Sequence, residues 1–154
     1  MSLDTTAMGR EFEPVSLLIT RSRLCAFAEA TGQHDPVYTD LDAAKQAGHR
    51  DLPVPPTFMF GIELEAPNPF AFLAELGVDL RRVLHGEQQF DYRQMAYAGD
   101  ELTATSRIAD MFDKKGGLLD FIVKDTTVTN QDGVTVAVLR GTTVVQNEFG
   151  KDGQ

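Results

Sequence analysis

The stretch from Phe27 to Tyr38 reads FAEATGQHDPVY, and it determines how the rest of this chain is interpreted. It begins inside a helical pattern, because apolar residues recur every three to four positions over residues 21–31. Thr20 is suited to cap the start of this helix, and Gly32 is suited to end it. Because Pro36 restricts the chain that follows, we expect a tight and rigid loop of polar residues after the helix.

The chain after this loop stays helical for some distance. A second short helix is predicted over Leu41–Ala47, with Asp40 as its N-cap and Gly48 as its end. Three closely spaced prolines then force an extended passage. The apolar segment Phe58–Glu65 fits either a helix or a strand, and one more helix is expected over Pro69–Leu76.

From Val83 onward the pattern changes to that of β-strands separated by turn residues. The strands that we expect are Val83–Tyr92, a segment around 102–108, another around 119–124 and a last one from Val134 to about Gln146. Helices in the first half and consecutive hairpins in the second predict an α+β fold, with helical material on one face of an antiparallel sheet. Such a sheet has unpaired edge strands, which a partner subunit commonly covers.

Composition places the chain among ordinary globular proteins and argues against nucleic acid as a partner. The chain has 154 residues, 42% of them hydrophobic and 24% charged, which suits one domain with its own core. The formal net charge of −9 lacks the basic footprint that a nucleic-acid-binding surface needs. Cys25 is the only cysteine, so no internal disulfide can form, and its apolar neighbours indicate a small buried side chain.

We divide the chain into a disordered N-terminal tail over residues 1–10, a single domain over 11–148 and a C-terminal tail over 149–154. The first residues lack a basic start followed by an apolar run, and no window approaches the roughly 18 apolar residues of a membrane span. We therefore expect a cytoplasmic protein with no membrane association.

Three stretches in the right order resemble the MaoC-like hydratase/dehydratase family. The stretch 27–38, followed by Ala43-Ala44, is similar to the signature of R-specific enoyl hydratases, an aromatic residue and then Gly-Asp-x-Asn-Pro-aliphatic-His. Residues 54–58 look like the sequence that follows this loop in the N-terminal MaoC-like dehydratase domain. Residues 85–92 and 98–102 resemble the core strand and turn of the same family, so the resemblance covers about residues 11–147.

The resemblance implies a hot-dog fold, in which a curled antiparallel β-sheet wraps around a central helix. It implies a homodimer, or a heterodimer with a catalytic MaoC-like subunit, and an acyl chain bound between the two domains. The family adds water to 2-enoyl thioesters or removes it from 3-hydroxyacyl thioesters, as in fatty acid metabolism. Its substrates are thioesters of coenzyme A or of acyl carrier protein, and it needs no metal and no redox cofactor.

The chain departs from the family at the two positions that carry the acid–base pair. The family's Asp position holds Gln33, and its His position holds Tyr38. An amide cannot accept and return a proton at accessible pH, and a phenol with a pKa near ~10 is a poor base at neutral pH. Asp35 stands at the family's Asn position and restores one carboxylate two residues along.

The site residues that follow from this comparison each have a structural alternative. We expect Gln33 and Tyr38 to line a pocket, with Asp35 and His85 as the candidate catalytic groups, although Asp35 also suits a turn cap. A pair of His85 and Glu87 is a further possibility, and a structural role for His85 at the start of the predicted strand is the alternative. The remaining substrate-binding candidates, which core packing or solvation would also explain, are Pro56, Thr57, Phe58, Arg81 and Arg82.

Three functions stay open at this point. The first is the non-catalytic, acyl-binding half of a heteromeric hydratase or dehydratase. The second is a self-sufficient homodimeric hydratase with relocated catalytic groups, for which Asp35 and His85 are the candidates. The third is an acyl-thioester-binding protein without turnover. The degenerate loop at residues 33–38 favours the first of these.

Overall fold

The computed structural model describes residues 3–147 and contains one antiparallel sheet. The predicted C-terminal tail over 149–154 lies outside the described residues. Neighbouring strands pair in the order β1-β3-β4-β5-β2, so β1 and β2 form the two edges of the sheet. The strands are β1 (Val15–Leu18), β2 (Val83–Tyr92), β3 (Glu101–Lys114), β4 (Leu119–Thr129) and β5 (Thr135–Gln146).

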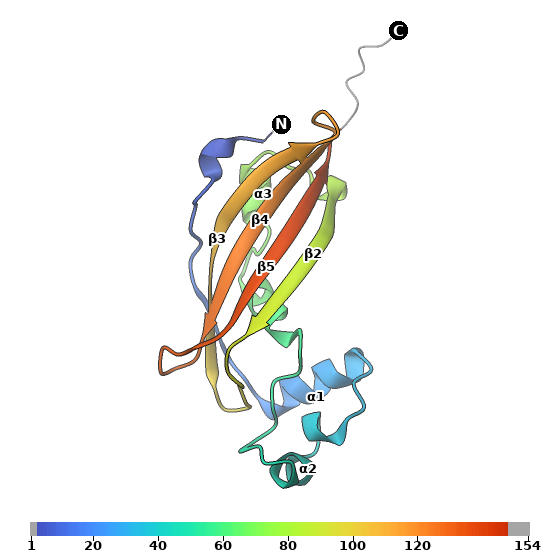
Figure 1. The fold of residues 1–154 in the computed structure, drawn as a ribbon, viewed down its shortest axis with the longest axis vertical. Coiled ribbons are helices and arrows are strands. Elements are labelled where there is room, and N and C mark those ends of the chain that lie inside the picture. Colours follow the sequence, from blue (N-terminus) through green and yellow to red (C-terminus); the bar gives the residue numbers. More distant parts are fainter. Residues whose placement is uncertain (1–2, 148–154) are drawn as a thin grey trace.

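The helical segments lie in two places around this sheet. The sheet curls, with α3 against one of its faces, whereas α1 and α2 lie beyond one end of it (Figure 1). No helix among residues 3–147 combines the length and the apolar composition that crossing a bilayer requires. The α-helices are α1 (Arg21–Ala30), α2 (Leu41–Gln46) and α3 (Ala71–Glu75), and the 3-10 helices are η1 (Thr5–Ala7), η2 (Pro36–Tyr38), η3 (Phe58–Glu65) and η4 (Leu80–Arg82). This arrangement confirms the predicted α+β class and hot-dog architecture.

Local sequence rules account for the ends of the first two helices. The hydroxyl of Thr20 accepts a hydrogen bond from the Arg23 N–H, and the carboxylate of Asp40 accepts one from the Ala43 N–H. Gly32 follows the first helix with a φ of 69°, in the left-handed region that favours glycine. The predicted caps and the predicted end of α1 are therefore confirmed.

The segment that the sheet wraps around is not one long helix. It consists of η3, a break at Pro67-Asn68-Pro69, and then the five residues of α3. The two prolines of the break prevent η3 from continuing into α3, since each lacks a backbone N–H and clashes with a preceding carbonyl. The interrupted helix matters for the site described below, because it leaves part of the concave face of the sheet uncovered.

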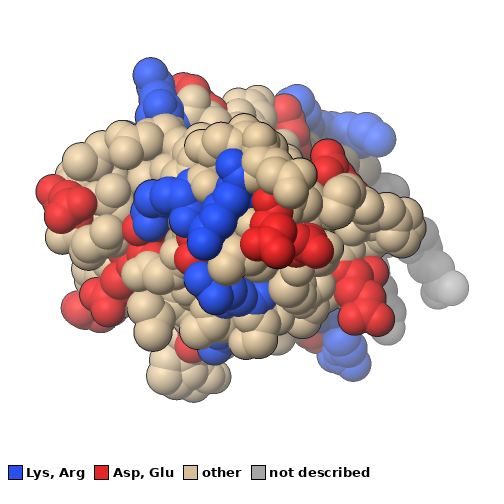
Figure 2. All heavy atoms as spheres, turned by 90° about the horizontal axis from the view of Figure 1, so that it is seen from below, with Lys and Arg blue, Asp and Glu red and all other residues tan. Residues whose placement is uncertain are grey.

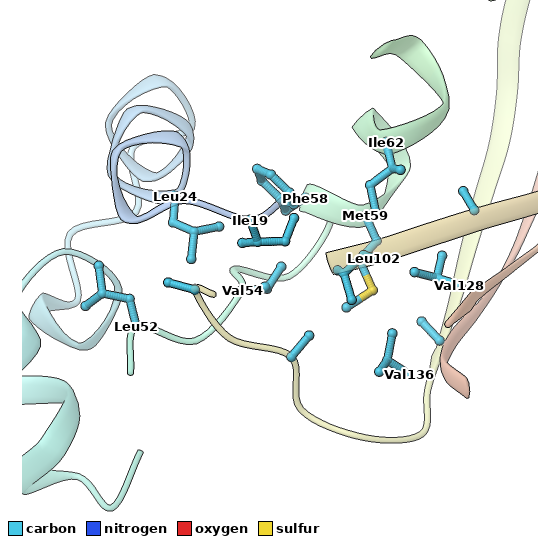
Figure 3. Packing of buried hydrophobic residues seen from close by; sticks show 14 of the residues in the cluster. Ile19, Leu24, Leu52, Val54, Phe58, Met59, Ile62, Leu102, Val128 and Val136 are labelled. Atoms are coloured by element: carbon cyan, nitrogen blue, oxygen red, sulfur yellow. The ribbon is translucent and has the colours of Figure 1, made fainter. Parts of the chain in front are cut away.

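Two separate apolar clusters form the core. The larger one joins Leu24 of α1 and Met59 and Ile62 of η3 to Leu102, Val128 and Val136 of the sheet (Figure 3). The second cluster lies further along the sheet, where α3 packs against the far ends of β3, β4 and β5, together with Leu3 and Val78. The members from these elements are Phe72, Leu73, Ile108, Met111, Ile122 and Val145. Inward-facing residues between the two clusters are polar or small.

Residues 3–10, which we expected to belong to an N-terminal tail, make defined contacts with the sheet in this structure. Leu3 is buried in the second core cluster, with 8% of its surface exposed. The N–H of Gly9 donates to the carbonyl of Ile108, and the N–H of Ile108 donates to the carbonyl of Arg10. These bonds to β3, together with one apolar anchor, order a segment whose polar composition alone indicated a tail.

Candidate functional site

The loop that resembles the hydratase signature is held by its own side chains. The amide oxygen of Gln33 accepts a hydrogen bond from the Asp35 N–H at 3.1 Å. A carboxylate oxygen of Asp35 in turn accepts one from the Val37 N–H, also at 3.1 Å, and so caps η2. Asp35 is exposed, and Gln33 and Tyr38 are half-buried. The geometry therefore gives Gln33 and Asp35 the role of loop supports.

The proline-rich stretch before η3 lies at the same end of the molecule as this loop. Phe58 is buried and packs edge-on against Phe27 of α1, with ring centroids 5.2 Å apart. Pro56 and Thr57 are exposed. Thr57 has a φ of 73°, which is strained for a β-branched residue, and its N–H donates to the hydroxyl of Tyr92 at 2.9 Å. The structure thus brings the start of η3 against α1, the helix that precedes the loop.

The two arginines proposed to meet phosphates have partners within the chain. The guanidinium of Arg81 donates to the carboxylate of Asp79, and this bond lowers the pKa of Asp79 to about 2. Arg82 donates to the carbonyl of Gln146 and to the side chain of Asn147, which fastens the start of β2 to the end of β5. Substrate binding by Arg81 and Arg82 stays a prediction.

A cavity of about 320 Å³ lies between the sheet and the interrupted helical segment. Its helical wall is mainly apolar and comes from η3, α3 and the break between them. Its lining comprises Phe60, Glu63, Leu64, Pro69, Phe70, Phe72 and Leu73 on that side, and Val83, Leu84, His85, Gln88, Lys124, Thr126, Leu139, Gly141, Thr142 and Thr143 on the strands. We refer to it as the concave-face cavity. Neither this cavity nor the smaller one found among residues 3–147 is lined by the loop at 33–38.

The strand wall of the concave-face cavity is polar where the two core clusters leave a gap. On β4, Lys124 and Thr126 lie between the buried residues Ile122 and Val128. The ammonium group of Lys124 lies 3.1 Å from a carboxylate oxygen of Glu63, and about four-fifths of each side chain is buried. It also lies over the rings of Phe12 and Phe72, at 5.1 and 5.3 Å from their centroids. A charged pair therefore faces a largely apolar cavity.

The two candidate catalytic residues, Asp35 and His85, are not brought together. His85 lines the concave-face cavity and packs edge-on against Phe60. It stands seven residues before Tyr92 on β2, so it lies roughly 20 Å along the strand from the end that touches Thr57. A bulge between His85 and Glu87 places these two side chains on opposite faces of the sheet. No group of three or more potential metal ligands occurs among residues 3–147.

The end of the molecule that carries α1 and α2 has closely mixed charges. Figure 2 shows basic and acidic side chains lying next to one another on this end. Arg21 bonds both carboxylate oxygens of Asp51 and lowers the pKa of that carboxyl to about 2. Asp100 is buried; burial alone would raise its pKa, but hydrogen bonds from the Tyr97 N–H, Arg50 and Gln131 together hold the pKa below 3.8.

Sequence comparison places the chain in a known family. Residues 6–139 match the family model described as FAS1-like, dehydratase domain region. A UPF0336 protein of Streptomyces coelicolor is 43% identical over 109 residues, which cover 70% of this chain and 73% of that protein. A UPF0336 protein of Saccharopolyspora erythraea is 32% identical over 147 residues, which cover 95% of this chain and 93% of that protein.

Solved structures agree with this placement. The chain is similar to a chain of the HadBC (3R-hydroxyacyl-ACP dehydratase) complex from Mycobacterium tuberculosis, with a TM-score of 0.75 and 25% identity, covering 92% of this chain and 99% of that one. The fold also matches the R-hydratase PhaJ1 from Pseudomonas aeruginosa, with a TM-score of 0.66 and 16% identity over 92% of this chain and 83% of that one. The chain therefore belongs to the FAS1-like dehydratase-region family and is a MaoC-like hot-dog protein related to the UPF0336 proteins.

Proposed function

We propose that this chain is the acyl-binding half of a heteromeric (R)-specific enoyl-thioester hydratase or 3-hydroxyacyl-thioester dehydratase. The observation that carries the proposal is that the loop at 33–38 has Gln33 and Tyr38 where the family has its Asp and His. Gln33 cannot act as an acid or a base at accessible pH, and both Gln33 and Asp35 accept hydrogen bonds from backbone N–H groups of the loop itself. The Asp and His that move protons are therefore supplied by a second MaoC-like subunit.

The edge of the sheet supports the need for a partner. β2 is an edge strand, and apolar side chains at or next to it are about half exposed, namely Leu84 (52%), Tyr92 (47%) and Met95 (50%). Exposed apolar residues along the open edge of a sheet favour association with another chain. The similar HadBC structure is itself a complex, which favours the same arrangement here.

The substrate follows from the same proposal. An acyl thioester of coenzyme A or of acyl carrier protein is bound between the two subunits, with no metal and no redox cofactor. The concave-face cavity offers an apolar wall for the acyl chain. We place the reaction in the cytoplasm, in fatty acid metabolism.

The self-sufficient alternative depends on Asp35 or His85 as relocated catalytic groups. Asp35 is exposed and caps η2, whereas His85 lines a cavity that the loop does not reach. No contact joins the two residues within the described chain, so the geometry offers this alternative no specific support. Binding without turnover is one outcome of the experiment below.

The test measures hydration of crotonyl-coenzyme A by the purified chain alone and mixed with MaoC-like proteins that have an intact Gly-Asp-x-Asn-Pro-x-His loop. We expect activity only in a mixture. Replacing the partner's loop Asp with Asn should cut the rate by about 10²–10⁴-fold, whereas Asp35→Asn in this chain, which preserves a capping side chain, should change it less than about threefold. Full activity of the lone chain, or inactivity of every mixture, would refute the proposal.

A further inference from the structure

The concave-face cavity lies where the core of this protein is interrupted. On each of three adjacent strands, two successive inward positions carry polar or small residues instead of large apolar ones, and a core cluster lies on either side. These positions are His85 and Gln88 on β2, Lys124 and Thr126 on β4, and Gly141 and Thr143 on β5. A continuous core would place Val, Leu or Ile here, so the gap is a feature of the sequence and not a loosely packed region.

Three of these residues form one row across the sheet. Lys124 pairs with Gly141, and Gly141 pairs with Gln88. The glycine at the centre of the row makes room for the amide of Gln88, since a Cβ atom there would lie 3.0 Å from its oxygen. The row therefore has a cationic group at one end and, over the glycine, an amide that reaches in from the other end.

Lys124 is equipped to bind a further oxygen atom. Its ammonium group has three N–H donors, and its one ion pair within the described chain is with Glu63. The ammonium group also lies over the rings of Phe12 and Phe72, and about four-fifths of the side chain is buried, so the group is not fully solvated. A plain alkyl chain filling the cavity would remove water from Lys124, Gln88 and Thr126 without replacing the lost hydrogen bonds.

From these observations we propose that the concave-face cavity binds acyl groups that carry a hydroxyl or carbonyl oxygen along the chain, beyond the oxygen that the reaction adds or removes. Lys124 determines this selectivity by donating to the additional oxygen, with Gln88 and Thr126 beside it. The apolar wall from Phe60 to Leu73 binds the hydrocarbon part of the same acyl group. The inference rests on the proposed acyl-binding role and specifies its substrate class.

The volume and the surroundings of the cavity fit such a ligand. About 320 Å³ is at the lower end of the range of roughly 300–1,000 Å³ typical of small-molecule sites, which suits one acyl group. Leu64, Phe70 and Leu84 line it and are each 44–52% exposed, so apolar surface surrounds the polar row. The residues named here form the cavity walls within one chain, so a binding test can begin with the lone chain.

The test uses calorimetry on the full chain with N-acetylcysteamine thioesters of decanoic acid and of hydroxydecanoic acids whose hydroxyl stands at different mid-chain carbons. We expect at least one hydroxylated thioester to bind about tenfold more tightly than the plain one, as for a hydrogen bond to a charged group. Lys124→Met should reduce this preference to less than about twofold while leaving binding of the plain chain intact. Lys45→Met, at an exposed position on α2, is the matched control and should leave the preference unchanged.

Gly141→Val provides a second variant, because it fills the centre of the row on a strand that tolerates β-branched residues. It should weaken binding of every thioester by more than tenfold, with thermal unfolding recorded to verify that the variant is folded. Equal binding of plain and hydroxylated thioesters, or a preference that survives Lys124→Met, would overturn the inference. If no thioester binds the lone chain while a mixture with a partner hydrates crotonyl-coenzyme A, the inference fails and the proposed function stands.

Discussion

Asp100 is the residue whose environment most clearly couples charge to stability. Its carboxylate is buried and accepts hydrogen bonds from the Tyr97 N–H, Arg50 and Gln131. Asp100→Asn removes the charge while preserving the shape, so we expect it to lower the free energy of unfolding at pH 7 by about 1–3 kcal/mol. Urea denaturation of both proteins measures this difference.

The same variant has a defined pH dependence. The pKa of Asp100 in the folded protein lies below its ordinary value of 3.8, so the carboxylate stabilises the fold fully above about pH 4. As pH falls through the lowered pKa, that contribution is lost, and the difference between wild type and Asp100→Asn should shrink towards zero. Asp91→Asn is the control, because Asp91 and Arg93 are both more than half exposed, and it should cost less than about 0.5 kcal/mol at pH 7. A difference that grows on acidification would contradict this interpretation.

At the level of elements, the bulge in β2 decides which side chains reach the concave-face cavity. His85 pairs with Thr143, and Glu87 pairs with Thr142, so the extra residue, Gly86, shifts the alternation by one position. Without the bulge, His85 and Glu87 would share a face. The bulge therefore separates a histidine and a glutamate that two-residue spacing would have placed side by side.

Gly86 has no room for a side chain, which makes the bulge testable. A Cβ atom would lie 2.7 Å from a methyl group of Val144 and 3.2 Å from the carbonyl oxygen of Thr142. We expect Gly86→Ala to lower the free energy of unfolding by about 1–3 kcal/mol, because strand β5 must shift. Gly61→Ala in η3, where the Cβ meets nothing within 4 Å, should change it by less than about 1 kcal/mol. Equal effects of the two substitutions in urea denaturation would count against a tight bulge.

The whole molecule has one long edge strand with apolar side chains beside it. If a partner covers β2, Leu84→Lys should weaken the association at least tenfold, because a lysine ammonium would lose its water at the contact. The melting temperature of the lone chain should stay nearly constant, since Leu84 is already 52% exposed. Sedimentation velocity, with the chain alone and with the partner that restores activity, measures the association. Val134→Lys, at the β4–β5 hairpin, is the control, and similar weakening by both variants would exclude β2 as the contact.

Most of the helices and strands, and the family, could be predicted from the order of residues alone. Thr20, Asp40 and Gly32 act locally, so their roles as caps and helix end could be predicted without knowing the fold. Val83–Tyr92 was predicted with the observed bounds, because strands have a two-residue period that the sequence displays. The substitutions at Gln33 and Tyr38 were also visible, since they stand inside a recognisable loop.

Where the remaining polar residues point depends on how distant strands pair in the folded chain. Lys124 has no unusual neighbours in sequence, and its position in a cavity follows from the register of β4 against β5 and from the break before α3. The ordering of residues 3–10 depends on hydrogen bonds to β3, about a hundred residues away in the chain. Caps and periodicity arise from interactions over a few residues, whereas cavities and bulges arise from pairing between distant strands, and a single sequence does not display that pairing.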